Sequence, residues 1–141
     1  MHVLAPCFCG IYNFNRVVQN ENIVMTGTVT FNRLYDGKYH YHEIGNYVLH
    51  KTPQNCFQTR IFIIKNTSFF IQKKDGSMLH EFQISQDSSL PLTLHHVHQC
   101  KNDIYELLLT FLSKNQFKTT YKIIGPYKNE QIHTIYTRCR G

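Results

Sequence analysis

The sequence predicts an all-β protein that folds as an up-and-down antiparallel β-barrel of about ten strands. Val, Ile, Thr, Tyr and Phe are frequent and Ala is nearly absent, a composition that favours strands over helices. Strand-like runs recur roughly every 8–12 residues and are separated by turn signals, which is typical of a sandwich or a barrel. A meander of neighbouring strands joined by tight turns closes most easily as an up-and-down barrel, and closure removes exposed sheet edges.

Five strands are predicted in the first half of the chain. Residues 23–33 alternate most cleanly, with Met25, Val29 and Phe31 on one face and threonines on the other, so that one side is buried and one is wet. Asp36-Gly37 is a hairpin signal, and the turn-like residues 53–55 are expected to break the chain. The predicted strands are 9–19, 23–33, 38–50, 56–65 and 68–73.

Five further strands are predicted in the second half. Asp75-Gly76 marks a tight turn, residues 85–91 form a polar connection, and Gly125-Pro126 ends a strand. Residues 107–112 have the composition of a helix as well as of a strand, so helix remains open there. The predicted strands are 78–84, 92–99, 104–114, 117–124 and 132–139.

Length and composition define the broad class. A chain of 141 residues can bury a real core as one domain, 1–141. The formal net charge is +6, but Lys and Arg are scattered, so a solvated basic surface is favoured over a nucleic-acid partner. The five Cys and the lack of a recognisable secretory signal predict reduced thiols in a cytoplasmic protein. No apolar run approaches the roughly 18 residues of a membrane helix, and the oligomeric state is unknown.

Two resemblances bear on the fold. Gly10-x-Tyr12 near the start and Arg138 near the end resemble the calycins, the lipocalin and fatty-acid-binding superfamily, with Tyr in place of the usual Trp. In that superfamily the Arg packs over the ring and closes the barrel floor, and a cation over a Tyr ring is favourable by about 0.5–1 kcal/mol.

The second resemblance is narrower and spans nearly the whole chain. The sequence resembles a family of short uncharacterised proteins grouped as a domain of unknown function. It implies a calycin-like barrel and no established activity. The matching motifs are Gly10, Tyr12 and Arg16; Tyr41, Glu43 and Gly45; Leu79 and His80; His98, Cys100, Asp103 and Tyr105; Gly125, Pro126 and Lys128; and Thr134, Tyr136 and Arg138.

The residues favour binding of a small amphipathic, anionic ligand inside the barrel. Tyr136 and Arg138 share one strand face, as a carboxylate clamp requires, and Arg60 is expected to join them. The ligand body is expected among Met25, Val29, Phe31, Ile61, Phe82, Leu107 and Leu109. The predicted ligand-binding residues are Arg16, Tyr41, Glu43, Arg60, His80, His98, Asp103, Tyr105, Lys128, Thr134, Tyr136 and Arg138. The other interpretation is that Arg138 only closes the barrel and that Arg16 pairs on the surface with Glu21 or Asp103.

Three alternatives remain open. Glu43 is expected to pair with Arg60, but an unpaired Glu43, or His80 or His98, would make an acid–base enzyme of the same cavity. His96, His98 and Cys100 share a strand face suited to a metal or haem. A barrel filled by its own side chains would instead favour a basic module that binds RNA or protein by its outer face. No phosphate loop, nucleophile elbow or Cys-x-x-Cys is present, so no catalytic or metal residue is assigned and the cofactor is unknown.

Overall fold

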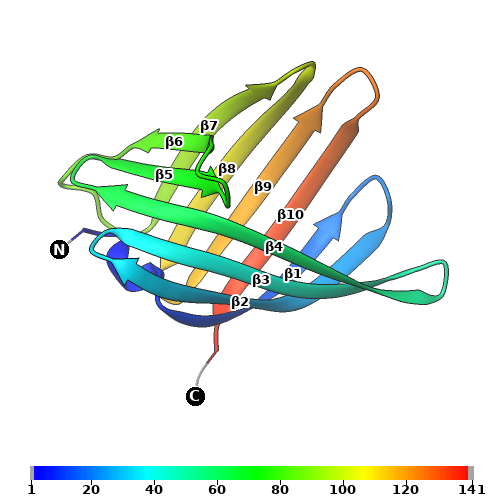
Figure 1. Cartoon of the computed structure of the whole chain (residues 1–141), viewed down its shortest axis with the longest axis horizontal. Helices are drawn as coiled ribbons and strands as arrows, with labels where there is room; N and C mark the ends of the chain where they lie inside the picture. The colour runs from blue at the N-terminus through cyan, green and yellow to red at the C-terminus, as the bar shows by residue number, and fades with distance from the viewer. Residues whose placement is uncertain (1, 140–141) are drawn as a thin grey trace.

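The computed structural model describes residues 2–139 and shows ten antiparallel strands in one sheet, which confirms the predicted all-β class (Figure 1). A short 3-10 helix, Ala5–Cys7, precedes them. The strands are β1 (Gly10–Val18), β2 (Ile23–Tyr35), β3 (Lys38–Leu49), β4 (Thr52–Lys65), β5 (Ser68–Lys73), β6 (Met78–Gln83), β7 (Leu92–Cys100), β8 (Asp103–Ser113), β9 (Gln116–Ile124) and β10 (Asn129–Arg138).

The sheet curls into a nearly closed up-and-down barrel. Each strand pairs with its neighbour in sequence, except that β6 and β7 do not pair, and β1 pairs with β10, so the strand order runs from β6 through β1 and β10 to β7. Strands β6 and β7 are therefore the two edges of the sheet, and Figure 1 shows them next to each other. Among residues 2–139 no backbone ladder joins these two edges, and we call the line between them the seam.

The structure corrects one local expectation, the break at residues 53–55, and decides another, the conformation of residues 107–112. Residues 53–55 do not break the chain but belong to β4, which follows β3 after a tight turn at His50 and Lys51, both with positive φ. β4 pairs with β5 only from Arg60 onward, so the part of β4 that contains Pro53 has one free edge. A proline is tolerated at such an edge because no amide donor is needed there. Residues 107–112 are strand, within β8.

The end of the barrel nearest the N-terminus is plugged by aromatic rings. Phe8 follows the short helix and packs with ring centroids 5.3–5.7 Å from five other rings, of Phe31, Tyr39, Phe62, Phe69 and Phe111. Tilted and edge-on contacts of this kind suit the ring quadrupoles. Leu4 and Cys7 of the same segment are fully buried, so this segment packs into the end of the barrel.

Two glycines make room for a ring deeper in the barrel. Gly27 on β2 lies opposite Gly45 on β3, and the Phe14 ring packs directly over both. A Cβ at Gly45 would lie 2.9 Å from that ring, closer than side-chain carbons normally approach. The ring in turn supports the guanidinium of Arg16, which lies 4.7 Å from its centroid.

Candidate functional site

The interior beyond the aromatic plug is hollow. A cavity of about 340 Å³ lies among the strands, within the range typical of small-molecule sites. Its walls include Phe62, Ile71, Leu107 and Leu109, which follow the inward parity of their strands. Eight of the predicted site residues line it: Arg16, Tyr41, Arg60, His80, His98, Tyr105, Thr134 and Tyr136.

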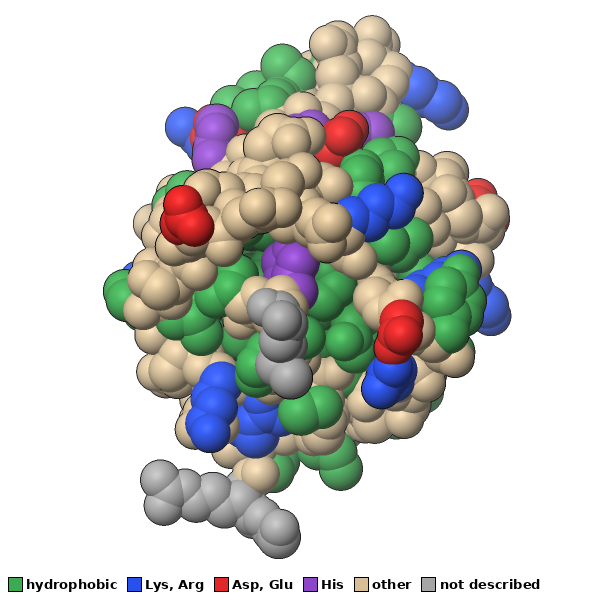
Figure 2. All heavy atoms as spheres, turned by 90° about the vertical axis from the view of Figure 1, so that its left-hand side faces the viewer, with side chains coloured by type: hydrophobic (Ala, Val, Ile, Leu, Met, Phe, Trp, Pro, Cys, Tyr) green, Lys and Arg blue, Asp and Glu red, His purple; other side chains and the backbone are tan. Residues whose placement is uncertain are grey.

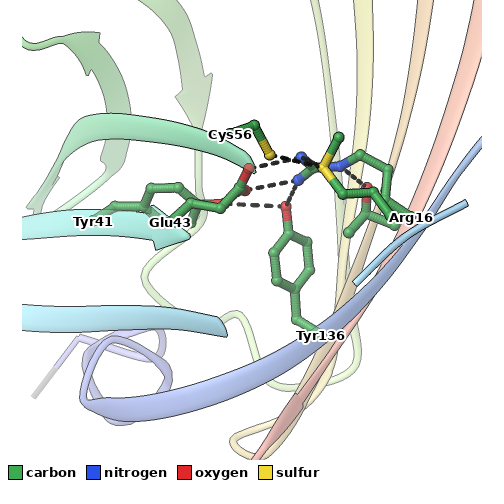
Figure 3. A network of polar contacts seen from close by, with 7 residues as sticks. Arg16, Tyr41, Glu43, Cys56 and Tyr136 are labelled. Atoms are coloured by element: carbon green, nitrogen blue, oxygen red, sulfur yellow. Dashed lines mark hydrogen bonds and ion pairs between the residues drawn. The ribbon is translucent and has the colours of Figure 1, made fainter. Parts of the chain in front are cut away.

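A buried ion pair joins Arg16, which lines the cavity, to Glu43 (Figure 3). The Arg16 Nη1 and Nη2 atoms each donate to one oxygen of Glu43 at 2.7 Å, and Glu43 is only 1% exposed. The Tyr41 hydroxyl donates to Glu43 at 2.5 Å, Arg16 Nε donates to Thr134 at 2.9 Å, and Arg16 Nη2 donates to Tyr136 at 3.1 Å. This bidentate geometry with satisfied neighbours is what a buried pair needs to be stable.

The partner predicted for Glu43 was wrong. Glu43 pairs with Arg16, not with Arg60, and Arg16 is not bound to Glu21 or Asp103 on the surface. The alternation of side chains along each strand places both Arg16 and Glu43 inside the barrel. Arg16 on β1 extends past β2, where it lies beside Met25, and contacts Glu43 on β3. Arg60 instead lies opposite Tyr41, one inward position farther along.

The surroundings of Arg16 keep its guanidinium charged. Burial works to lower the pKa of Arg16, but the hydrogen bonds to Glu43 and the nearby phenols outweigh it, so the pKa lies above its ordinary value. The pKa of Tyr41 is raised, first by burial and then by Tyr136 and Glu43. Glu43 therefore has a full set of partners and lacks the unpaired state that an acid–base role would require.

A second polar cluster connects the cavity with the seam. His80 on β6 contacts His96 on β7 across the seam, with 2.9 Å between their Nδ1 atoms. The Nε2 atom of His80 lies 2.7 Å from the hydroxyl of Tyr121, a cavity-lining residue of β9. Burial, together with the charges that His96, His98 and Arg60 carry when protonated, lowers the pKa of His80 to about 3. His80 is thus a neutral imidazole at physiological pH.

Two cations face the cavity without an acidic partner. Arg60 on β4 and Lys73 on β5 are cross-strand neighbours, and both line the cavity. Arg60 Nη1 donates to the carbonyl oxygen of Thr59 at 3.0 Å. Within residues 2–139, neither Arg60 nor Lys73 lies within ion-pair distance of a carboxylate. The cavity therefore has an excess of positive charge on one wall.

Arg138 lies at the plugged end and does not line the cavity. Its guanidinium lies 4.7 Å from the centroid of the Tyr12 ring, as the calycin resemblance implies. Its N–H groups donate to backbone carbonyl oxygens, among them that of Pro6 at 2.7 Å and that of Cys9. Of the predicted clamp, Tyr136 lines the cavity and Arg138 does not, because the two lie at different depths along β10.

Replacing Arg138 with Met is expected to lower the free energy of unfolding by about 1–3 kcal/mol, because a charged donor to several carbonyls is lost. The affinity for a probe in the cavity should change less than about twofold. Urea unfolding and a fluorescence titration measure the two effects. A tenfold loss of affinity with the fold intact would instead return Arg138 to the site.

The other predicted residues do not line the cavity. Asp103 forms an ion pair with Lys128 Nζ at 3.6 Å, which ties the β7–β8 hairpin to the β9–β10 connection. Neither residue lines the cavity. Ile61 has the outward parity of β4, because its neighbour Phe62 is the inward one. Met25, Val29, Phe31 and Phe82 pack the core around the cavity and do not line it.

The alternative of a metal site lacks a cluster of metal-ligating side chains in the part of the chain that the structure describes. His96, His98 and Cys100 do share the inward face of β7. Yet over residues 2–139 no group of three or more His, Cys, Asp or Glu side chains is placed to hold a metal ion.

The sequence reasoning missed Tyr121 and Lys73. Tyr121 has the parity of Phe117 on β9, and Lys73 has the parity of Ile71 on β5, so both inward directions were readable. What the sequence does not show is that the barrel interior at their depth stays empty.

The chain belongs to the family of unknown function DUF6314, which matches residues 8–138. No curated protein matches the sequence. Among solved structures it is similar to the S-type phycobiliprotein lyase CPES from Guillardia theta, with a TM-score of 0.67, 6% identity, and coverage of 96% of this chain and 90% of that one.

Designed barrels are similar as well. A redesigned β-barrel, mFAP1, bound to DFHBI gives a TM-score of 0.56 at 9% identity, covering 96% of this chain and 99% of the other. A fluorescence-activating β-barrel of de novo design gives 0.56 at 13% identity, covering 99% of this chain and 100% of the other. At these identities the similarity shows the barrel fold alone. Within residues 2–139 there is no helix of the length and hydrophobicity needed to cross a membrane.

Proposed function

We propose that this protein binds a small amphipathic, anionic molecule in the barrel cavity and that its role is binding, not catalysis. The observation that carries the proposal is a hollow with largely apolar walls that Arg60 and Lys73 line without an acidic partner in the described chain. Arg60 is half-buried, and a partly desolvated cation is stabilised when an anion pairs with it, whereas Lys73 is exposed and adds its charge at the edge of the cavity. A ligand with an acidic head and an apolar body satisfies both features.

Two further observations support a ligand over a basic interaction module. That module required an interior filled by its own side chains, whereas this interior keeps a cavity of about 340 Å³. Over the face shown in Figure 2, Lys and Arg side chains are scattered and form no continuous patch. The similar barrel mFAP1 is described as bound to DFHBI, which makes this architecture a suitable host for a small molecule.

The proposal includes two features of the whole protein. The calycin-like character rests on the Tyr12–Arg138 contact at the plugged end. A cytoplasmic location is in keeping with the five free cysteines of the described chain, because disulfides form mainly in oxidising compartments.

Replacing Arg60 or Lys73 with Met is expected to weaken the binding of anilinonaphthalene sulfonate about tenfold to a hundredfold. Loss of a charged hydrogen bond costs roughly 1.5–3 kcal/mol. The measurement is a fluorescence titration near pH 8, in which the sulfonate of the probe is fully ionised.

Matched controls are Arg33→Met and Lys118→Met, which remove a cation of the same kind from the exposed surface. They should leave the affinity within about twofold. Equal losses in the control and cavity variants would show binding to the general positive surface and would refute the proposed site. Native mass spectrometry of the purified protein would reveal a natural ligand that remains bound.

A further inference from the structure

The chain of hydrogen bonds from Tyr121 through His80 to His96 runs from the cavity to the seam. The register places Tyr121, Leu107 and His96 side by side on β9, β8 and β7, and the seam brings His80 against His96. Tyr121 lines the cavity at one end, and His96 is only half-buried at the other. His80 between them is almost fully buried, and both of its nitrogens are engaged.

The hydrogen positions in this chain follow from the chemistry of its members. Neutral His80 carries one N–H and has one bare nitrogen. A phenol is a stronger hydrogen-bond donor than a neutral imidazole, which favours the arrangement in which Tyr121 donates to His80 Nε2. His80 must then carry its hydrogen on Nδ1 and donate it to His96 Nδ1. In this state the Tyr121 hydrogen points away from the cavity, and a ligand meets only the oxygen.

Adding one proton to His96 reverses the chain. A cationic His96 has hydrogen on both nitrogens, so its Nδ1–H must become the donor to His80 Nδ1. Neutral His80 then carries its hydrogen on Nε2 and donates it to the Tyr121 oxygen. The Tyr121 hydroxyl hydrogen has to turn toward the cavity. One proton is taken up in total and none is released, and the cavity gains a donor.

We propose that the Tyr121–His80–His96 chain makes anion binding in the cavity proton-linked, so that protonation of His96 at the seam turns the Tyr121 hydroxyl into a donor to the ligand's oxyanion. The inference rests on the proposed function and adds a chemical requirement. The ligand's head is a carboxylate, sulfonate or similar oxyanion that accepts a hydrogen bond from Tyr121 while Arg60 supplies charge.

The surroundings of His96 determine the pH at which this happens. The groups that act on His96 are His98 and His95 on its own strand and His80 and Glu81 on β6. Glu106 on β8 pairs with His95, while Tyr121 on β9 and Arg60 on β4 act on His80. Burial lowers the pKa of His96. The neighbouring His98 and His95 lower this pKa further, and Glu81 raises it. The free protein therefore takes up this proton below the usual range of histidine, and a bound anion raises the pKa because it favours the cation.

The test is a titration with anilinonaphthalene sulfonate at about pH 8 and about pH 5, since the sulfonate stays ionised throughout. The affinity should tighten at least about tenfold at the lower pH, the size of one charged hydrogen bond. Tyr121→Phe should lose this tightening between the two pH values. His96→Gln should lose it too, whereas His95→Gln, on the outward face, should keep it. Near-ultraviolet circular dichroism at both pH values checks that the native packing persists.

The outcomes separate the two proposals. No binding at either pH, or no loss in the Arg60 and Lys73 variants, overturns the proposed function. Binding that depends on Arg60 but not on pH overturns only the proton linkage. Tightening that survives Tyr121→Phe would show simple attraction to the His96 charge and would refute the role of the hydroxyl. A neutral probe such as Nile red should show no tightening, and an equal response would point to acid loosening of the barrel and overturn the linkage.

Discussion

Replacing Glu43 with Gln is expected to lower the free energy of unfolding by about 3–5 kcal/mol. The amide keeps the volume but removes the only carboxylate within ion-pair distance of Arg16 in the described chain, leaving a buried cation without compensation. Tyr41 also loses its charged acceptor. Urea unfolding followed by far-ultraviolet circular dichroism measures the change.

Two comparisons make this result specific. Glu81→Gln changes an exposed carboxylate on β6 and should alter stability by less than about 0.5 kcal/mol. The double variant Arg16→Met, Glu43→Leu removes both charges and should recover most of the loss, because apolar replacements often match a buried pair. An unchanged unfolding midpoint for Glu43→Gln would mean that Arg16 finds water or another acceptor.

Replacing Phe8 with Ala is expected to cost about 3–5 kcal/mol. Phe8 is buried at the centre of the ring cluster that plugs the barrel, and the strands around it cannot collapse into the space that it would leave. Urea unfolding reports the loss. The affinity for a cavity probe should fall much less than the stability, since Phe8 does not line the cavity.

Phe57→Ala serves as the matched control, because Phe57 is 69% exposed on the outer face of β4. Its replacement should cost less than about 0.5 kcal/mol. If the two alanine variants lost similar stability, the N-terminal segment would not be the plug described here.

The strands were predictable because period-two patterns and turn chemistry are local. Every predicted strand overlaps the observed one, and the Asp36-Gly37 turn lies where it was expected. The polar interior of β3 could also be read, since Tyr39, Tyr41 and Glu43 share a parity and all lie inside.

The candidate site was less predictable, because parity gives a direction and not a partner. Which inward residues meet depends on strand order and stagger around the barrel, and this is why Glu43 was assigned to Arg60 when it binds Arg16. The sequence also does not show how deep in the barrel each inward side chain lies. Tyr136 and Arg138 point the same way on one strand, yet one lies at the cavity and the other at the plug.

A crystal structure of the complex with anilinonaphthalene sulfonate would test the central claim most directly. We expect the rings between the apolar walls and the sulfonate within hydrogen-bonding distance of Arg60 or Lys73. A probe found on the outer face, or a barrel whose own side chains fill the hollow, would contradict the account.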